Sequence, residues 1–392
     1  MQASTTMPPP RKKICLLGAT GSIGRSTLKV IEDFPEEFEA VGLAAQTSEQ
    51  PLFDVGRRLG VKHYCLTEPG SAEPPEGAHL FSGCRGLIEL IDACQPELVV
   101  VATVGAVGLE PTLHAIDRGL TIALANKEVL VMAGRLVMER ARRAGVSILP
   151  IDSEHNAIFQ CLAGARDVPL RRIILTASGG PFRGRTWREL ENVTVDEALM
   201  HPTWSMGPKI TIDSATFMNK GFEVIEVHHL FDMAPEKIEV IVHPQSVIHS
   251  MIEHPDGSMI AQMGITDMYL PILNVLGYPK RLTNQRFERM NLAELGPLTF
   301  EPPDLDAFPC LAYAYQAIRA GRTYPTVLNA ANEIGVERFL NREIRFVDIP
   351  RIIDGALQEH AYPSGDPDLE QILEADRRTR QWARRGVSVP NG

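Results

Sequence analysis

The chain has 392 residues, of which 44% are hydrophobic and 22% charged, values typical of folded globular proteins. At roughly 150 residues per domain, this length predicts two or three domains. Acidic residues outnumber basic ones by 49 to 39, and the resulting net charge of -10 argues against a nucleic-acid-binding protein. A local basic pocket for a small anion stays compatible with that charge.

Cysteine usage and the amino terminus indicate the compartment. Six cysteines are scattered without paired spacing, which argues against a disulfide framework or a zinc-thiolate site and favours a reducing environment. No apolar run reaches the ~18 residues that a membrane span needs. Residues 1–13 have no apolar segment of the kind found in signal peptides, and we expect a disordered lead-in there. A cytoplasmic protein without a membrane partner is therefore expected.

The first part of the chain alternates short β-branched runs with helical stretches. This alternation is typical of βαβ units with a parallel sheet, and it predicts an α/β domain over residues 1–150. The segment 67–79, rich in Pro, Glu and Gly, is expected to be a surface loop within this domain. The expected strands lie near residues 12–18, 39–45, 96–105, 120–126 and 146–152, and a helix is expected at 22–33.

Beyond residue 150 the pattern changes. Residues 151–285 are expected to form a second, α+β domain, residues 286–310 an extended connector, and residues 311–392 a helical bundle with apolar residues near 3.6 spacing. Asp-Gly in the segment 254–257 predicts a hairpin turn. The other expected elements are strands at 171–178 and 237–244, a helix at 217–230, and hairpin arms at 246–253 and 258–263.

A glycine-rich turn follows the first expected strand and opens a helix. Its glycines, Gly18, Gly21 and Gly24, have the spacing Gly-x-x-Gly-x-x-Gly. In this position glycines let the backbone approach a dinucleotide pyrophosphate, whose charge is stabilised by the helix N-terminus. The turn therefore predicts a Rossmann-like domain, although a tight turn without a ligand is the alternative.

The end of the second expected strand bears on the choice of cofactor. NAD binders usually place an acid there to bond the ribose, whereas this chain has Gln46, Thr47 and Ser48. Without a carboxylate to repel a 2'-phosphate, NADP is favoured over NAD. The alternative is that backbone groups alone bind the adenosine end, which leaves the preference undetermined.

Two acids follow the strand at 146–152. If the chain is still extended there, Asp152 and Glu154 share one face and attract a hard cation such as Mg²⁺ or Mn²⁺. A solvated strand end is the alternative. A third partner is offered by Asn219 and Glu223, which share a helical face, with Lys220 beside them as a cation suited to phosphate. An exposed polar helix face explains the same spacing.

Several loops carry further candidates. Ser178 precedes two glycines whose amides can face an anion, and the polar segment 201–209 contains a Trp that suits a lid over a ligand as well as it suits the core. Residues 126–128 lie at the end of an expected strand, where open α/β sheets bind ligands. The pair of Glu226 and His229 is interpreted as structural.

Eight motifs in this order closely resemble the 1-deoxy-D-xylulose 5-phosphate reductoisomerase family, from about residue 12 to the C-terminal helices. They are GATGSIG (18–24), LANKE (124–128), PIDSEHNAIFQ (150–160), LTASGGPF (175–182), HPTWSMG (201–207), DSATFMNKGFE (213–223), HPQSVIHSM (243–251) and LNAANE (328–333). The resemblance implies an enzyme of isoprenoid precursor synthesis in the methylerythritol phosphate route. Such enzymes rearrange a ketose phosphate and reduce the product with NADPH on a divalent cation, Mg²⁺, Mn²⁺ or also Co²⁺. It also implies a cofactor domain, a catalytic domain, a helical domain and a homodimer.

The resemblance also assigns roles to residues. The metal ligands would be Asp152, Glu154 and Glu223, which with Lys127 form the catalytic group. Substrate would be held by Ser153, Glu154, Ser178, His201, Trp204, Ser214, Asn219, Lys220 and Glu223. The cofactor would contact Thr20, Gly21, Ser22, Ile23, Gly24, Gln46, Thr47, Asn126, Lys127, Glu128, Met206 and Gly207.

The chain departs from the family pattern in two places. The family commonly has Gly or Lys followed by Asn where this chain has Gln46 to Ser48, and often a basic residue where it has Met200. Two alternatives are kept at this point. An aspartate-semialdehyde-type dehydrogenase needs a nucleophilic cysteine, and a non-catalytic NADP-sensing regulator needs no metal ligands.

Overall fold

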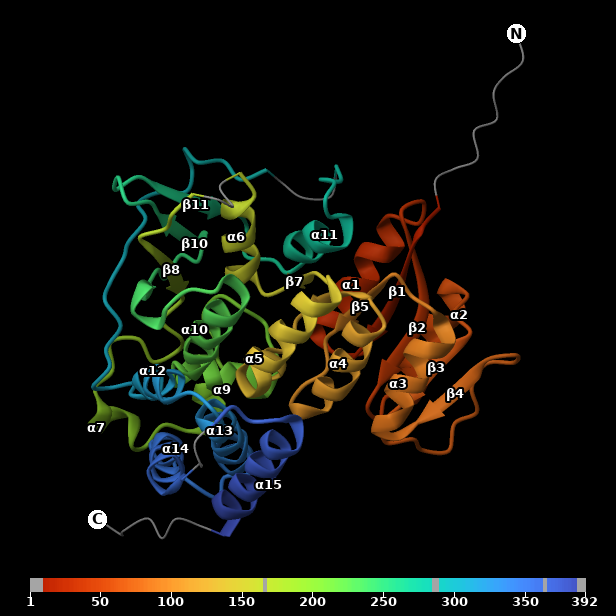
Figure 1. The fold of residues 1–392 in the computed structure, drawn as a ribbon. Coiled ribbons are helices and arrows are strands. Elements are labelled where there is room, and N and C mark those ends of the chain that lie inside the picture. The colour runs from red at the N-terminus through yellow and green to blue at the C-terminus, as the bar shows by residue number, and fades with distance from the viewer. Residues whose placement is uncertain (1–9, 165–167, 284–288, 362–364, 386–392) are drawn as a thin grey trace. The chain divides into compact units, whose positions relative to one another are not determined.

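The structure, a computed structural model, describes residues 10–164, 168–283, 289–361 and 365–385. Contacts divide the chain into two compact units, each described here by itself (Figure 1). The expected division into three domains and a connector stays a prediction. Residues 1–9 of the expected lead-in and 286–288 of the expected connector lie outside the described residues. Unit 1 comprises Met1–Asn126, Arg140–Asp152 and Met268–Asn284, and unit 2 comprises Lys127–Glu139, Ser153–Asp267 and Gln285–Gly392.

Unit 1 contains a seven-stranded sheet in the order β4-β3-β2-β1-β5-β6-β7, and all of its strand pairs are parallel. The strand order reverses between β1 and β5, which is the position where doubly wound sheets bind ligands. The α/β class with a Rossmann-like first part is confirmed. The strands are β1 Lys12–Leu17, β2 Phe38–Ala45, β3 His63–Leu66, β4 His79–Ser82, β5 Leu98–Val101, β6 Thr121–Leu124 and β7 Ile148–Pro150.

Helices cover both faces of this sheet. A Cβ built at Gly56 of α2 would meet Tyr64, whereas one at Gly86 of α3 would meet Cys65. Because Tyr64 and Cys65 are neighbours on β3, they point to opposite faces, so α2 and α3 lie on opposite sides. The helices of unit 1 are α1 Ser22–Asp33, α2 Glu49–Leu59, α3 Gly83–Cys94, the 3-10 turn η1 Ala106–Gly108, α4 Leu109–Asp117 and α11 Tyr269–Gly277.

Helix α11 was not expected in unit 1, since it follows the hairpin in sequence. It packs against α1, and the Tyr269 hydroxyl donates to the Asp33 carboxylate at 2.8 Å. The Lys12 ammonium donates to the carbonyl oxygens of Leu276 at 2.7 Å and Tyr278 at 3.1 Å. These long-range contacts carry the segment back to β1 and could not be inferred from local pattern.

Helix α5 (Lys127–Ala144) is kinked at Ala133, where φ is -137° and ψ is 24°. A Cβ built on the next residue, Gly134, would lie 2.1 Å from the His229 ring. The Met132 carbonyl accepts a hydrogen bond from the Thr326 hydroxyl at 2.9 Å. At the kink, α5 therefore passes close to the His229 side chain. The Thr326 hydroxyl binds the Met132 carbonyl next to the kink.

Unit 2 contains a four-stranded sheet in the order β11-β10-β8-β9. Strands β8 and β9 are parallel, while β10 is antiparallel to both β8 and β11. The expected hairpin is confirmed, and Asp256 accepts hydrogen bonds from the Ser258 amide and hydroxyl in its turn. Helix α6 (Ser153–Leu162) packs on β10 and β11. The strands are β8 Arg172–Ala177, β9 Ile238–Val242, β10 Ile248–Glu253 and β11 Met259–Met263.

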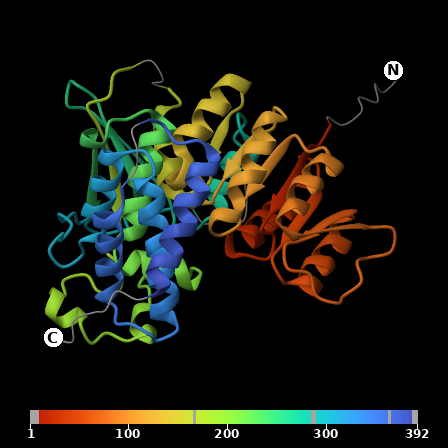
Figure 2. The ribbon, with the colours of Figure 1, turned by 60° about the horizontal axis from the view of Figure 1, so that its bottom comes forward.

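The remaining helices of unit 2 share one large apolar core. The C-terminal helices lie side by side, and α12 packs against α10 (Figure 2). Between residues 289 and 309 the chain has no helix and only the isolated bridge of Val242 with Glu301. The helices are α7 Trp187–Leu190, α8 Val195–Ala198, α9 Pro208–Ala215, α10 Met218–Phe231, the 3-10 turn η2 Pro235–Lys237, α12 Cys310–Ala320, α13 Tyr324–Leu340, α14 Asp348–Glu359 and α15 Leu369–Arg385.

Within the ranges that the structure describes, no helix is both long enough and apolar enough to cross a bilayer.

Candidate active site

The glycine-rich turn of unit 1 joins β1 to α1, as the sequence predicts. Gly18 has φ of 94°, and a Cβ there would lie 2.3 Å from the Ala102 carbonyl oxygen. A Cβ at Gly24 would lie 2.1 Å from the Gly18 carbonyl oxygen. Gly21 is the N-cap of α1. The glycines therefore bring β1, the turn and the first helical turn together, with amides of the helix N-terminus available to an anion.

The end of β2 differs from the expectation of a site without acids. Gln46 is exposed, and its side-chain amide donates to the Glu68 carboxylate at 2.8 Å. Glu68 follows β3, the next strand of the sheet. The carboxylate missing from the end of β2 is thus supplied by its neighbour, a position that strand-end spacing within β2 could not reveal.

Asn126 lies at the end of β6 and is buried. Its side-chain amide donates to the Thr103 and Gly105 carbonyl oxygens, each at 2.9 Å. These bonds fix the loop that follows β5. Asn126 therefore shapes the carboxyl edge of the sheet, whatever contact it makes with a cofactor.

The expected carboxylates come together at the N-terminus of α6 and on α10. Ligand oxygens of Asp152, Glu154 and Glu223 all lie within 4.8 Å of one another. The reason given from sequence is wrong, however, because the chain is not extended through Glu154: α6 begins at Ser153. Asp152 directly precedes the helix and Glu154 lies in its first turn, and the helix start rather than a strand face places them together.

Lysine and amide groups bind these carboxylates. The Lys220 ammonium lies 2.9 Å from Glu154 Oε1 and 2.5 Å from Glu223 Oε2. The Asn219 amide donates to Glu223 Oε1 at 2.7 Å, which confirms the shared helical face. Burial raises the pKa of Glu154, but Lys220 and Lys127 outweigh it and hold the pKa at about 2. Burial and the nearby Glu154 charge raise the pKa of Glu223.

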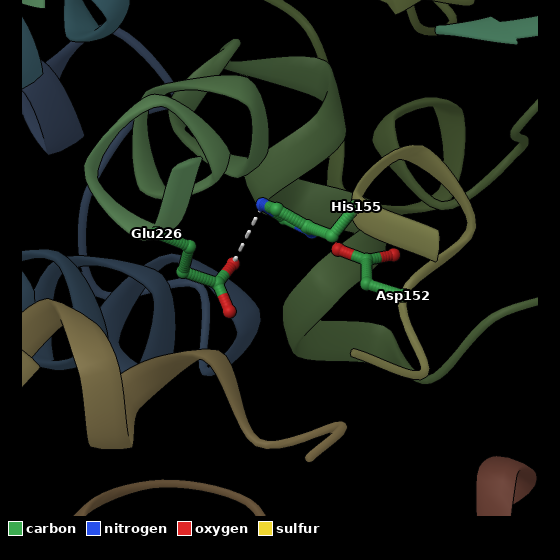
Figure 3. A group of neighbouring side chains, drawn as sticks. All are labelled: Asp152, His155 and Glu226. Atoms are coloured by element: carbon green, nitrogen blue, oxygen red, sulfur yellow. Dashed lines mark ion pairs between the residues drawn. The ribbon is translucent and has the colours of Figure 1, made fainter. Parts of the chain in front are cut away.

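A second acidic group adjoins the first. Asp152, His155 and Glu226 also have potential ligand atoms within 4.8 Å of one another, and Figure 3 shows the His155 ring directed at the Glu226 carboxylate. His155 Nε2 lies 3.7 Å from Glu226 Oε2. Lys127 Nζ lies 3.6 Å from Glu223 Oε1 and 3.8 Å from Glu226 Oε2. Sequence reasoning missed His155 and treated Glu226 as structural, although Glu226 lies one helical turn beyond Glu223.

The donor set fits a divalent cation. When ionised, Asp152, Glu154, Glu223 and Glu226 carry four negative charges, whereas Lys127 and Lys220 carry two positive ones. The pKa of Glu223 is raised first by burial and then by the nearby Glu154 charge, so the ionised carboxylates need a positive partner. A cation of charge two would balance the group, and carboxylate oxygens are the ligands that Mg²⁺ and Mn²⁺ prefer.

Three of the expected substrate residues converge on one histidine. His201 Nε2 lies 3.1 Å from Ser178 Oγ and 3.1 Å from Ser214 Oγ. His201 Nδ1 accepts the Trp204 amide at 3.0 Å, and burial lowers the pKa of His201. The neutral ring therefore carries its proton on Nε2 and donates toward the hydroxyl oxygens. Both serine hydroxyl hydrogens stay available to an anion.

The segment 201–207 has neither helix nor strand, and α9 begins at Pro208. Trp204 is half-buried, with its ring centroid 6.5 Å from that of His249 on β10. Burial lowers the pKa of His249, so this ring is neutral as well. Trp204 is thus absent from the fully buried core, as a lid residue requires. Met200, one of the departures from the family pattern, is 73% exposed.

The cysteines are mostly buried, which disfavours nucleophilic chemistry by their thiols. Five of the six cysteines are buried, and only Cys84 is exposed. Burial raises the pKa of Cys161 to about 11 and of Cys65 to about 12. A thiol with such a pKa is protonated near neutral pH and is a poor nucleophile.

A parallel sheet with a glycine-rich first turn, together with carboxylates and lysines at the start of α6 and on α5 and α10, defines a dinucleotide-binding α/β protein whose side chains can also hold a divalent cation. Family models described as 1-deoxy-D-xylulose 5-phosphate reductoisomerase match residues 14–134 and, for the C-terminal domains of that enzyme, residues 148–231 and 263–382. The chain belongs to the 1-deoxy-D-xylulose 5-phosphate reductoisomerase family.

Individual relatives support this family membership. The enzyme of Exiguobacterium sibiricum is 49% identical over 96% of this chain and 98% of its own, and that of Thermoanaerobacter pseudethanolicus is 48% identical over 94% and 98%. The solved structure from Zymomonas mobilis with NADPH has a TM-score of 0.86 at 41% identity, covering 95% of this chain and 98% of its own. A solved complex with NADPH, fosmidomycin and magnesium has a TM-score of 0.88 at 40% identity, with the same coverage.

Membership makes the chain an oxidoreductase. Neither the semialdehyde dehydrogenase nor the non-catalytic regulator is supported.

Proposed function

We propose that the chain converts 1-deoxy-D-xylulose 5-phosphate into 2-C-methyl-D-erythritol 4-phosphate with NADPH and a divalent cation. Mg²⁺ and Mn²⁺ are the favoured cations, and Co²⁺ is a further candidate. The observation that carries the proposal is the convergence of Asp152 and Glu154, at the start of α6, with Glu223 on α10. The family relationship supplies the substrate and the reaction.

The carboxylates would hold the cation, which when bound would polarise the substrate carbonyl and an adjacent hydroxyl. The Ser153 hydroxyl donates to Glu154 at 2.5 Å and so orients this carboxylate. Lys127 and Lys220 lie against the Glu223 carboxylate and oppose the rise in its pKa that burial and Glu154 cause. These residues thus prepare a rigid, charged site before the substrate arrives.

The substrate phosphate would bind where hydroxyl, amide and ammonium groups gather. Ser178 and Ser214 are held by His201, while Asn219 and Lys220 extend from the first turn of α10. Binding energy from a phosphate remote from the reacting carbons helps to orient them. Trp204 would cover the ligand and exclude water.

NADPH would bind unit 1 at the switch point between β1 and β5, and when bound it would supply the hydride. The contacts to the cofactor would come from Thr20, Gly21, Ser22, Ile23, Gly24, Gln46, Thr47 and Asn126. Lys127, Glu128, Met206 and Gly207 complete the proposed set.

We also propose that the enzyme is a cytoplasmic homodimer without nucleic-acid or membrane partners. The free state of all six cysteines supports a reducing compartment. Strand β11 is the outer strand of its sheet, and Met259 and Ile260 on it are 48% and 43% exposed. An outer strand with exposed apolar residues suits pairing with a second copy. Light scattering of the wild type and of Ile260→Lys tests this, since dimerisation through β11 predicts a monomeric variant.

One assay tests the activity itself. NADPH oxidation is followed by the absorbance of the reduced nicotinamide, with the ketose phosphate, in chelator-treated buffer and after addition of Mg²⁺ or Mn²⁺. We expect turnover that requires both the ketose phosphate and the cation. Turnover without any cation, or none with all components present, would contradict the proposal.

A further inference from the structure

Lys209 occupies a junction between several helices of unit 2. It lies in the first turn of α9, directly after the loop 201–207. Its ammonium is 2.8 Å from Asp213 Oδ2 and 3.0 Å from Glu128 Oε1, and lies over the Phe222 ring at 4.8 Å from the centroid. One side chain thus joins α9, α5 and α10.

The Glu128 contact reaches the catalytic group through the next residue. Glu128 is buried and follows Lys127 in the first turn of α5. Lys127 Nζ in turn lies within 4 Å of both Glu223 and Glu226. Because neighbouring residues of one helical turn move together, an anchor on Glu128 fixes where Lys127 stands.

The C-terminal helices meet the same junction. Asn332 of α13 donates to Asp213 Oδ1 at 2.7 Å. The charge of Lys209 also acts on Glu333, which accepts Arg380 of α15 at 2.7 Å. Burial raises the pKa of Asp213 and of Glu333, and the charge of Lys209 opposes both shifts. Lys209 is therefore a cation shared among acids of α5, α9 and α13.

We propose that Lys209 is a positioning residue: it couples the substrate loop 201–207 to the first turn of α5, so that the loop and Lys127 are held together. This inference rests on the proposed function of those two segments. It involves no contact of Lys209 with the reacting atoms. It predicts that weakening one attachment loosens both segments.

Hydrogen–deuterium exchange with mass spectrometry measures this without turnover. In Lys209→Gln we expect amides of 127–132 and of 201–211 to exchange about tenfold faster than in the wild type. The free energy of local opening should fall once the Lys209 ammonium no longer binds Glu128 and Asp213. Lys209→Arg should restore protection in both. The matched control is Lys12→Gln, which removes a lysine that donates to two carbonyl oxygens of unit 1 and should change neither segment.

Kinetics provide the second readout. Lys209→Gln should raise the KM for the ketose phosphate about tenfold, with a smaller fall in kcat, while Mn²⁺ binding measured by electron paramagnetic resonance stays within about twofold, because the carboxylates are untouched. If hydrogen exchange in Lys209→Gln became faster only at 208–215, Lys209 would have a local structural role and the proposed coupling would be wrong.

A milder variant covers the case in which Lys209→Gln does not fold. Glu128→Gln keeps the shape of the side chain and leaves Asp213 on Lys209. We expect faster exchange at 201–211 as well as at 127–132; a change at 127–132 alone would overturn the proposal. Failure of the proposed function would instead appear as an inactive wild type, whereas the exchange pattern stands independently of activity.

Discussion

The glycine-rich turn between β1 and α1 and the carboxylate group around α6 and α10 are built in opposite ways. The turn consists of consecutive residues, and its form depends on the absence of side chains at Gly18 and Gly24. The carboxylate group consists of charged side chains, and it joins Asp152 and Glu154 at the start of α6 with Glu223, which is far from them in sequence. A mutation in the glycine-rich turn is therefore expected to destabilise the fold together with the binding site. A mutation of one carboxylate is expected to abolish activity while the fold stays stable.

The largest effect is expected at the carboxylates. Glu223→Gln should lower kcat about a thousandfold, about 4 kcal/mol of transition-state stabilisation, because the cation loses a charged ligand. The midpoint of thermal unfolding should stay unchanged or rise, since burial disfavours the ionised form of Glu223. Steady-state kinetics and calorimetry measure both. Activity within tenfold of the wild type would remove Glu223 from the metal ligands.

Gly24→Ala tests the other side of the comparison. The added Cβ would lie 2.1 Å from the Gly18 carbonyl oxygen, so the free energy of unfolding should fall by about 3 kcal/mol. Gly21→Ala is the matched control, because its Cβ would be 3.4 Å from the same atom. Urea unfolding of the two variants measures the difference. Equal stabilities would show that the turn can relax and is less dependent on glycine than its geometry indicates.

Trp204 belongs to a third category, a half-buried residue on a loop. Trp204→Ala should raise the KM for the ketose phosphate about tenfold while NADPH affinity stays the same, because only substrate contacts are lost. Thermal unfolding should shift little. A large fall in the unfolding midpoint with normal kinetics would instead place Trp204 among the residues that stabilise the fold.

Within unit 1, the Glu68 side chain adds a negative charge next to Gln46 in the proposed cofactor site, which is otherwise formed largely by backbone groups. Its carboxylate lies beside Gln46 and would repel a 2'-phosphate. Glu68→Gln should therefore raise the preference for NADPH over NADH about fivefold, the effect of roughly 1 kcal/mol from an exposed charge. The ratio of kcat/KM for the two cofactors measures it. An unchanged ratio would mean that the 2'-phosphate binds away from Gln46.

The smallest effect concerns a buried carboxylate outside the site. Asp348 accepts hydrogen bonds from the Arg345 amide and the Arg351 side chain, each at 2.9 Å. Burial raises the pKa of Asp348, but the bonds from Arg345 and then Arg351 outweigh it and lower the pKa. The stabilisation is thus present above the ordinary pKa of about 3.9 and is lost as the pH falls through the folded-state value.

Asp348→Asn should accordingly cost about 1 kcal/mol at pH 7, and the cost should shrink toward pH 3. Urea unfolding across this pH range measures it. A constant cost at every pH would assign the loss to packing rather than to charge.

The sequence predicted what depends on local pattern. Spacing between near neighbours was enough to predict three features. They are the turn that joins β1 to α1, the hairpin turn at 254–257, and the helical face shared by Asn219 and Glu223. The strands β3 and β4 were not predicted because their sequences, HYCL and HLFS, contain no β-branched residues, unlike the equally short β5 and β6. The helix start at Ser153 was missed because the preceding apolar run continued the strand pattern.

The rest of the site depends on distant pairs. Lys209 meets Glu128, and Lys127 meets Glu226, across long stretches of chain. No periodicity links such positions, and only the packing of α5, α9 and α10 brings them together. Glu226 was nevertheless within reach of inference, since it follows Glu223 by one helical turn.

The kink of α5 has an evolutionary consequence. A Cβ at Gly134 would overlap the His229 ring, so neither position can vary freely. A larger residue at 134 requires a smaller one at 229, and the pair is expected to change by compensating substitutions. Gly134→Ala should therefore be harmful in the wild-type background and nearly neutral together with His229→Ala, a coupling that a double-mutant cycle expresses as a single free energy.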